Sequence, residues 1–253
     1  MGASVLSKES IMAEPLQSSV RNRLLAAMST NDFGLLQADL EGVSLKVRDL
    51  LVEPNKRIKY VHFIEEGLAS VIAENSGDEH LEVGHVGCEG LTGSSVINGV
   101  DRTPNKTFVQ VAGSAFRLRA DDLTQAMEES PSLRALLLRF MQATLIQLSH
   151  CALANGRYSI HERLARWLLM CHDRVDGNNL PLTHEFVSLM LGVRRAGVTE
   201  ALHVLEGRGL IGVSRGGIVV RDRTKLEDAA NGCYGLPEAE YGRLIGATKV
   251  LAH

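Results

Sequence analysis

The most constraining feature of this sequence is a segment near its C-terminal end, where two short helical patterns are separated by one glycine. Thr183 is a suitable N-cap for a helix that runs to about Leu191, and Gly192 suits the left-handed turn that follows. A second helix is predicted from about Arg195 to Glu206, after which further glycines stop it. Two helices joined in this way form a helix-turn-helix if their crossing faces are apolar.

The residues at that crossing meet the requirement, and Ser188 is small where the two helices approach most closely. The apolar positions have the spacing that buries both crossing faces, and they are Val187, Leu191, Val193, Val198, Ala201 and Leu202. The outward positions of the second helix share one face, from which polar side chains can reach base edges in a major groove. These positions are Arg195, Ala196, Thr199, Glu200 and His203.

A β-hairpin is predicted directly after the two helices. Its strands are Leu210–Val213 and Ile218–Arg221, and Arg215 lies at the tip, where an arginine suits contact with phosphate. The segment 194–225 has seven basic residues against three acidic ones, a net charge of +4. The rest of the chain has 20 basic and 27 acidic residues, a net charge of −7. The sequence therefore places a basic module on an acidic body.

Residues 20–125 are predicted to be rich in β-structure, after a short helix near Val20–Ala27. Short runs with β-branched residues alternate with turn signals, among them 66–67 and 112–113, which is typical of a sandwich, jelly roll or barrel. The predicted strands are Tyr60–Ile64, Leu68–Ala73, Leu81–Val86 and Thr107–Leu118.

The apolar pattern then changes to the period of a helix. Ser130 and Pro131 begin a long helix that Asn155 and Gly156 are expected to end, and Ser159 caps the next helix. The long helix is either an ordinary core helix or a helix that also meets a partner helix, and the periodicity leaves both open. The residues expected at a dimer contact are Leu133, Leu137, Phe140, Thr144 and Leu148.

Composition and spacing exclude several classes of protein. No apolar run approaches the 18 residues of a membrane span, and no signal peptide is visible, so neither a membrane nor export is expected. The four cysteines form no zinc or disulfide pattern, which favours a reduced, cytoplasmic chain. His62, His80 and His85 lack the HxH spacing of a cupin metal site and are expected at the surface or at strand edges. No metal and no enzymatic activity are therefore predicted, with a cupin-like metalloenzyme and a protein-binding module as the alternatives.

The helix-turn-helix segment resembles that of the Crp/Fnr superfamily of bacterial transcription regulators. The resemblance is carried by LPLTHEFVSLMLGVRRAGVTEALHVLEGRGLIGVSRGGIVVRDR (180–223), and upstream by EVGHVGCEGLTG (82–93), FVQVAGSAFRL (108–118) and HERLARWLLMCHDRV (161–175). It implies an α+β protein with a double-stranded β-helix (jelly-roll) sensor domain, a dimerisation helix and a winged helix-turn-helix. The expected boundaries are 20–125 for the sensor domain, 126–156 for the helix, 157–225 for the DNA-binding domain and 226–253 for a C-terminal tail.

The resemblance also implies partners and roles for individual residues. The expected partners are a second copy of the chain, a pseudo-palindromic DNA duplex, RNA polymerase and a small-molecule effector of unknown identity, with activation and repression both open. Arg195 matches the arginine with which the family reads guanine, whereas Ala196 and Glu200 depart from the family's pattern, so the target sequence cannot be copied. The positions that match phosphate contacts are Thr183, Arg194, Ser214 and Arg215.

The effector site is less well matched than the DNA-binding segment. Gly87, Glu89 and Gly90 resemble the loop that precedes the phosphate-binding pair of cyclic-nucleotide-binding members. Arg102 and Thr103 form an Arg-Thr pair, but Pro104 follows it, and counting back from Phe108 places the family positions on Asn105 and Lys106 instead. A cyclic nucleotide is therefore not favoured, and no cofactor is predicted.

Overall fold

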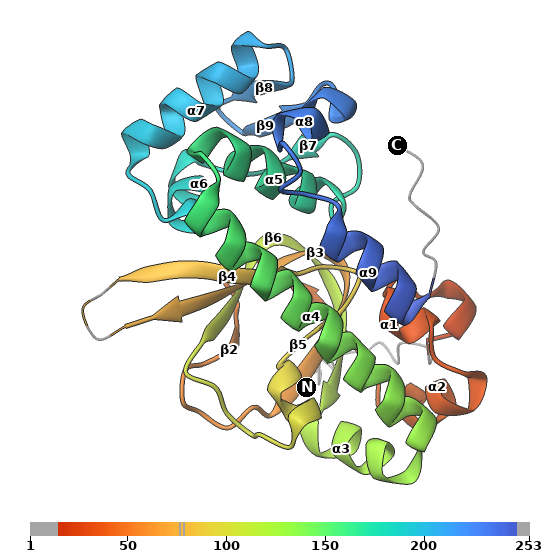
Figure 1. Ribbon diagram of the computed structural model, residues 1–253. Helices are drawn as coiled ribbons and strands as arrows, with labels where there is room; N and C mark the ends of the chain where they lie inside the picture. Colours follow the sequence, from red (N-terminus) through yellow and green to blue (C-terminus); the bar gives the residue numbers. More distant parts are fainter. Residues whose placement is uncertain (1–14, 76, 78, 247–253) are drawn as a thin grey trace, which may run out of the picture.

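The computed structural model describes residues 15–246 except 76 and 78 (Figure 1). An antiparallel β-sheet domain comes first, the long helix α4 (Pro131–Arg157) runs along it, and a helical domain with a small sheet of its own follows (Figure 1). This arrangement confirms the predicted α+β class and its order of sheet domain, long helix and winged helix-turn-helix.

The sheet domain begins with short helices, of which the sequence predicted only the first. After a 3-10 turn at Gln17–Ser19, the side chain of Asn22 caps α1 (Arg23–Ala26), and that of Ser29 caps α2 (Thr30–Gln37). The strands then pair in the order β1-β6-β3-β4, with β2 also on β6 and β5 on β3. They are β1 (Glu41–Leu45), β2 (Leu50–Val52), β3 (Tyr60–Glu74), β4 (His80–Val86), β5 (Leu91–Thr92) and β6 (Lys106–Arg119), with a 3-10 helix, Ser94–Asn98, before β6.

Strand β3 joins two runs that the sequence separated. Tyr60–Ile64 and Leu68–Ala73 form one strand that bends at Gly67, and the expected turn at 112–113 is the matching irregularity of β6. Gly67 has φ 90°, and a Cβ on Gly113 would lie 2.0 Å from the carbonyl oxygen of Glu66. The glycines therefore allow two paired strands to bend together, which local sequence alone reads as two turns.

Three helices connect the sheet domain to the helical domain. α3 (Ala120–Glu129) leads into α4, where Ser130 is the N-cap and Pro131 the first helical residue, as predicted. α4 continues past the expected break at 155–156, and Ser159 then begins α5 (Ile160–His172) with a capping box that includes Glu162.

The helical domain contains the predicted helix-turn-helix and hairpin, and the C-terminal tail adds two helices. The elements are β7 (Asn179–Leu180), α6 (His184–Leu191), α7 (Arg195–Gly207), β8 (Ile211–Ser214), β9 (Gly217–Val220), α8 (Arg223–Ala229) and α9 (Leu236–Ile245). α9 lies along α4 rather than on the helical domain, and Arg139 of α4 donates to the carbonyl oxygen of Leu244 (Figure 1). The end of the expected tail, 247–253, lies outside the described residues.

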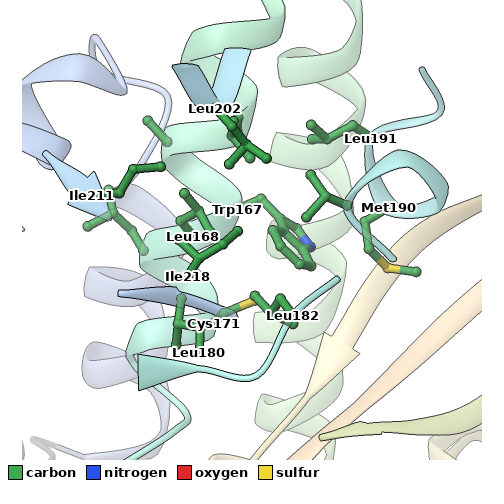
Figure 2. Packing of buried hydrophobic residues seen from close by; sticks show 14 of the residues in the cluster. Trp167, Leu168, Cys171, Leu180, Leu182, Met190, Leu191, Leu202, Ile211 and Ile218 are labelled. Carbon is green, nitrogen blue, oxygen red and sulfur yellow. The ribbon is translucent and has the colours of Figure 1, made fainter. Parts of the chain in front are cut away.

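The core of the helical domain continues into the sheet domain. Figure 2 shows Trp167, Leu168 and Cys171 of α5 facing apolar side chains from α6, α7 and the hairpin. The same cluster includes residues of β3 and β6, and the ring of Phe108 stacks on that of Phe186 with 6.3 Å between centroids. The two domains therefore share one apolar contact that places the helix-turn-helix against the sheet.

α4 has two apolar faces, and they correct the expected dimer contacts. Leu133, Leu137 and Phe140 face inward and are buried in the core of the sheet domain, so they have no surface left for a partner. Thr144 is half-buried, and its hydroxyl donates to the carbonyl oxygen of Phe140. Of the expected residues, only Leu148 lies on the outer face, which also has the large exposed side chains of Leu138, Leu145 and Leu153.

The outer face of α4 carries a regular repeat. Leu138, Met141, Leu145, Leu148 and Ala152 follow one another at alternating spacings of three and four residues, which is the repeat of a coiled-coil seam. Of these, Met141 is half-buried and also packs against the core of the sheet domain. Leu138, Leu145 and Leu148 are exposed by 45%, 56% and 38%. Among the described residues one helix, α4, is long and apolar enough to cross a membrane by length and composition, although charged and polar residues interrupt its apolar run.

Candidate nucleic-acid interface

The helix-turn-helix is built by local interactions that the sequence predicts. The hydroxyl of Thr183 accepts from the backbone N–H of Phe186 and so caps α6, as expected. Gly192 adopts φ 61° and ψ 36°, and a Cβ there would lie 2.7 Å from Leu81 of the sheet domain. The hydroxyl of Ser188 donates to the carbonyl oxygen of Val193, which ties the first helix to the turn.

The packing of α7 leaves one of its faces free. Val198, Ala201, Leu202 and Leu205 are buried against the rest of the domain. On the opposite face, Arg195, Ala196, Glu200 and His203 are exposed and Thr199 is half-buried. Figure 1 shows α7 at the outer edge of the molecule, away from α4. The predicted reading face is therefore presented to solvent as one surface.

Arg195 is held only weakly. One of its terminal nitrogens lies 3.4 Å from a carboxylate oxygen of Glu185, and the two side chains are 70% and 66% exposed. An ion pair this exposed contributes little, so Arg195 can exchange Glu185 for another acceptor at a small cost in free energy. The contact between Glu185 and Arg195 could not be predicted from the sequence, because their distance depends on how α6 and α7 cross.

The hairpin supplies a second basic position beside α7. Ser214 donates from its hydroxyl to the carbonyl oxygen of Gly217 and closes the turn, and Arg215 at the tip is exposed. Among the described residues, neither Arg194 nor Arg215 has an ion-pair partner within the chain. Both guanidinium groups are therefore available to an external anion such as a phosphate.

A shallow hollow extends the interface toward the sheet domain. Thr183, Arg195 and Thr199 line it from α6 and α7, and Arg48 lines it from the turn between β1 and β2. Arg48 is exposed and has φ 74°. Arg48 could not be predicted from the sequence, because only the docking of the two domains brings it near the reading face.

The residues expected at an effector site do not form one pocket. The carboxylate of Glu89 is buried and accepts from Arg174 of the helical domain at 2.7 Å, whereas Arg102 is exposed and pairs with its neighbour Asp101. Thr103 contributes its carbonyl oxygen to the loop before β3, where it accepts from the backbone N–H of Asn55.

The two glycines of that loop have a packing role. A Cβ on Gly87 would lie 2.8 Å from the side chain of Arg174, and a Cβ on Gly90 would lie 2.6 Å from the ring of Phe140. Burial raises the pKa of Glu89, but the charge and hydrogen bond of Arg174 outweigh it and hold that pKa below its usual value. The loop therefore connects the sheet domain to α4 and to the end of α5.

Two of the three histidines that the sequence placed at the surface or at strand edges lie in the interior. His62 is buried on the inner strand β3, contrary to the expectation, whereas His85 is buried and His80 exposed on β4, an edge strand of the sheet as expected. Nδ1 of His62 lies 3.2 Å from the hydroxyl of Thr92, and Nδ1 of His85 lies 3.1 Å from Glu82. The described part of the chain contains no group of three or more His, Cys, Asp or Glu side chains that could hold a metal ion.

Comparison with known proteins agrees with this geometry. Residues 162–229 match the family model described as the Crp-like helix-turn-helix domain. No curated protein matches the chain.

Solved structures share the fold of most of the chain. A putative transcriptional regulator of the crp/fnr family from Eubacterium rectale aligns with a TM-score of 0.65 and 18% identity, over 83% of this chain and 98% of that one. FixK2 from Bradyrhizobium japonicum aligns with a TM-score of 0.66 and 18% identity, over 75% and 96% of the two chains. The c-di-GMP responsive global regulator CLP from Xanthomonas campestris aligns with a TM-score of 0.60 and 16% identity, over 76% and 99%.

The chain thus shares its fold with solved Crp/Fnr-type regulators, and the family model matches its helix-turn-helix domain. Residues 162–229 of this chain are therefore a Crp-like helix-turn-helix domain, which the sequence also predicted.

Proposed function

We propose that the protein binds a pseudo-palindromic DNA operator as a homodimer and regulates transcription in the bacterial cytoplasm, under the control of a signal that acts on its sheet domain. The observation that carries this proposal is the exposed polar face of α7, which begins with Arg195 and lies beside the basic hairpin tip at Arg215. An exposed face of this kind on the second helix of a helix-turn-helix is suited to the major groove.

Arg195 is the residue that we assign to base reading. Its planar guanidinium can donate two parallel hydrogen bonds to O6 and N7 of guanine. Glu200 and His203 lie farther along the same exposed face. Glu200 either accepts from the amino group of cytosine or pairs with an arginine, and both roles remain open.

The remaining residues of the interface are assigned to phosphate contact. Arg194 precedes α7, while Ser214 and Arg215 lie on the hairpin, so together they flank the reading face on two sides. Thr183 lies at the start of α6, where backbone N–H groups add to the positive potential. Contacts of this kind fix the register of the protein on the duplex and leave the choice of sequence to α7.

The outer face of α4 supports the homodimer. Its repeat of three and four residues fits a two-stranded coiled coil with the same helix of a second copy. A dimer with two-fold symmetry presents its two reading helices about 34 Å apart, so the operator is expected to have half-sites one helical turn apart.

The experiment that tests the proposal is selection of bound duplexes from a random pool by the full-length protein. We expect an enriched sequence with two-fold symmetry. Arg195→Ala should lose about 1–3 kcal/mol at one base pair of each half-site and should relax the preference there. Arg102→Ala removes an equally basic side chain from the sheet domain and should select the same sequence as the wild type.

Two results would contradict the proposal. No enrichment of any duplex by the wild type would contradict DNA reading, and the same selected sequence from Arg195→Ala would contradict the role of that arginine. Binding should also weaken steeply as salt concentration rises, because phosphate contacts release counterions. If the affinity of the protein for duplex DNA does not change with salt concentration, a helix-turn-helix that binds only protein is favoured instead.

A further inference from the structure

A cavity lies where the sheet domain, α4 and the C-terminal helices meet, on a different part of the molecule from the reading face of α7. Its volume is about 380 Å³, which is within the range of small-molecule sites. It is lined by Arg23 of α1, by Val86 and Glu89 around the end of β4, by Phe140 and Ala143 of α4, by the turn that follows α5, and by residues of α8 and α9. The C-terminal tail, to which the sequence assigned no role, thus supplies one wall.

One side of the cavity is apolar. Val86, Phe140 and Ala143 contribute hydrocarbon from the sheet domain and α4, and Pro237 contributes it from α9. Phe140 cannot easily withdraw, because its ring is packed against Gly90. This side therefore offers a fixed surface for an apolar group.

The other side of the cavity is charged, and most of its charges are already paired. Arg174 binds Glu89 at 2.7 Å, and Arg223 binds Asp173 at 2.8 Å. The hydroxyl of Tyr241 donates to the carbonyl oxygen of Glu89. Each buried charge of these two pairs therefore has a partner within the protein.

Arg23 is the exception among these cations. Its side chain is half-buried at the cavity wall and forms no hydrogen bond or ion pair with the described residues of the chain. Glu238 also lines the cavity, but its carboxylate accepts from the backbone N–H of Gly235 and caps α9, where the helix N-terminus offsets its charge. A partly buried guanidinium without an anion beside an apolar wall is suited to a ligand that brings the anion.

We infer that this cavity binds a small organic anion, a carboxylate with an apolar body, whose carboxylate pairs with Arg23 and whose body lies against Val86, Phe140 and Ala143. The ligand would occupy a junction between domains. Arg174 at this junction donates to Glu89 of the sheet domain and to Gln147 of α4, and it lies in the turn that directly follows α5 of the helical domain. Occupancy of the cavity would therefore favour one placement of the DNA-binding domain relative to α4.

The test measures binding by calorimetry on the full-length protein with two pairs of probes. The carboxylates are 3-phenylpropionate and hexanoate, and each is compared with its uncharged amide. We expect at least one carboxylate to bind at least tenfold more tightly than its amide. Arg23→Gln should weaken that carboxylate at least tenfold, whereas Arg23→Lys should retain part of the affinity because it keeps the charge.

A second variant probes the apolar wall without removing any charge. Ala143→Leu fills space on the α4 side and should abolish binding while the protein stays folded, as judged by its thermal unfolding. Arg102→Gln, on a distant exposed loop, should bind like the wild type. The inference is overturned if neither carboxylate binds the wild type, or if Arg23→Gln and Ala143→Leu bind as tightly as the wild type. Because this test contains no DNA, its failure would leave the proposed DNA-binding function untouched.

Discussion

The ion pair between Glu89 and Arg174 offers a direct measure of how firmly the sheet domain is joined to the helical domain. The two side chains are only 11% and 7% exposed, and their charged atoms lie 2.7 Å apart. Removing one partner of a buried pair leaves an uncompensated charge and costs about 3–5 kcal/mol. Arg174→Met should therefore lower the free energy of unfolding by about that amount, since Arg174 also gives up its bonds to Met170 and Gln147.

A double-mutant cycle separates the pair from the other contacts of each residue. Glu89→Gln keeps the shape of the side chain and removes its charge, so the double variant with Arg174→Met contains no buried charge at this place. We expect the double variant to be more stable than Arg174→Met alone, with a coupling free energy of about 1–3 kcal/mol. The assay is urea unfolding at one fixed protein concentration, because a dimer would make stability depend on concentration.

The pH dependence of the single variant supplies an independent check. In the wild type Arg174 holds the pKa of Glu89 below its usual value, so this pair stabilises the protein above pH 4.5 and loses its contribution as pH falls. In Arg174→Met the buried carboxylate loses its partner, so its pKa should rise and the variant should lose less stability on acidification than the wild type. Additive single effects, or a cost below about 1 kcal/mol for Arg174→Met, would refute the view that this pair joins the domains.

Three further predictions concern α4 and a buried histidine. Leu145→Glu should dissociate the proposed dimer in sedimentation without unfolding the chain. Val100→Glu, at an exposed apolar position in a loop, should leave the dimer intact. If Leu145→Glu does not change the oligomeric state, the outer face of α4 is not the dimer interface. Phe140→Ala should cost about 3–5 kcal/mol of unfolding free energy and leave the seam of α4 in place, because its ring is buried in the sheet domain. Burial, with a smaller contribution from Arg117, lowers the pKa of His62 to about 4. As pH falls, His62 therefore takes up a proton in the unfolded chain before it does so in the folded protein. The free energy of unfolding should accordingly fall by roughly 3 kcal/mol at most between pH 6.5 and pH 4. His62→Gln should flatten this part of the pH profile, and an equal slope in the variant would contradict the assignment.

The helix-turn-helix could be predicted because its determinants are local. Thr183 and Gly192 act on neighbours within a few residues, and the structure confirms the cap and the left-handed turn that they were predicted to form. The hairpin was predictable for the same reason, since a turn with two glycines lies between two short apolar runs. The boundaries of these elements therefore agree with the sequence to within one or two residues.

The faces of α4 could not be predicted in the same way. Apolar residues occur on both sides of this helix, so a stripe drawn at helical spacing passes from the inner face at Leu133 to the outer face at Leu148. Only the position of the sheet shows which leucines are already covered. The contact between the sheet domain and the helical domain was equally hidden, because Glu89 and Arg174 are 85 residues apart and nothing in either local sequence indicates the other.

The stacking of Phe108 on Phe186 constrains how the DNA-binding domain can move. Any other arrangement of the two domains must first separate these rings and expose the apolar side chains of β3 and β6 beneath them to water. Exposing such an apolar surface to water gives a positive heat-capacity change. The free-energy difference between two domain arrangements would therefore depend on temperature in a curved, not a linear, way. Growth temperature would then act on the same equilibrium as any chemical signal.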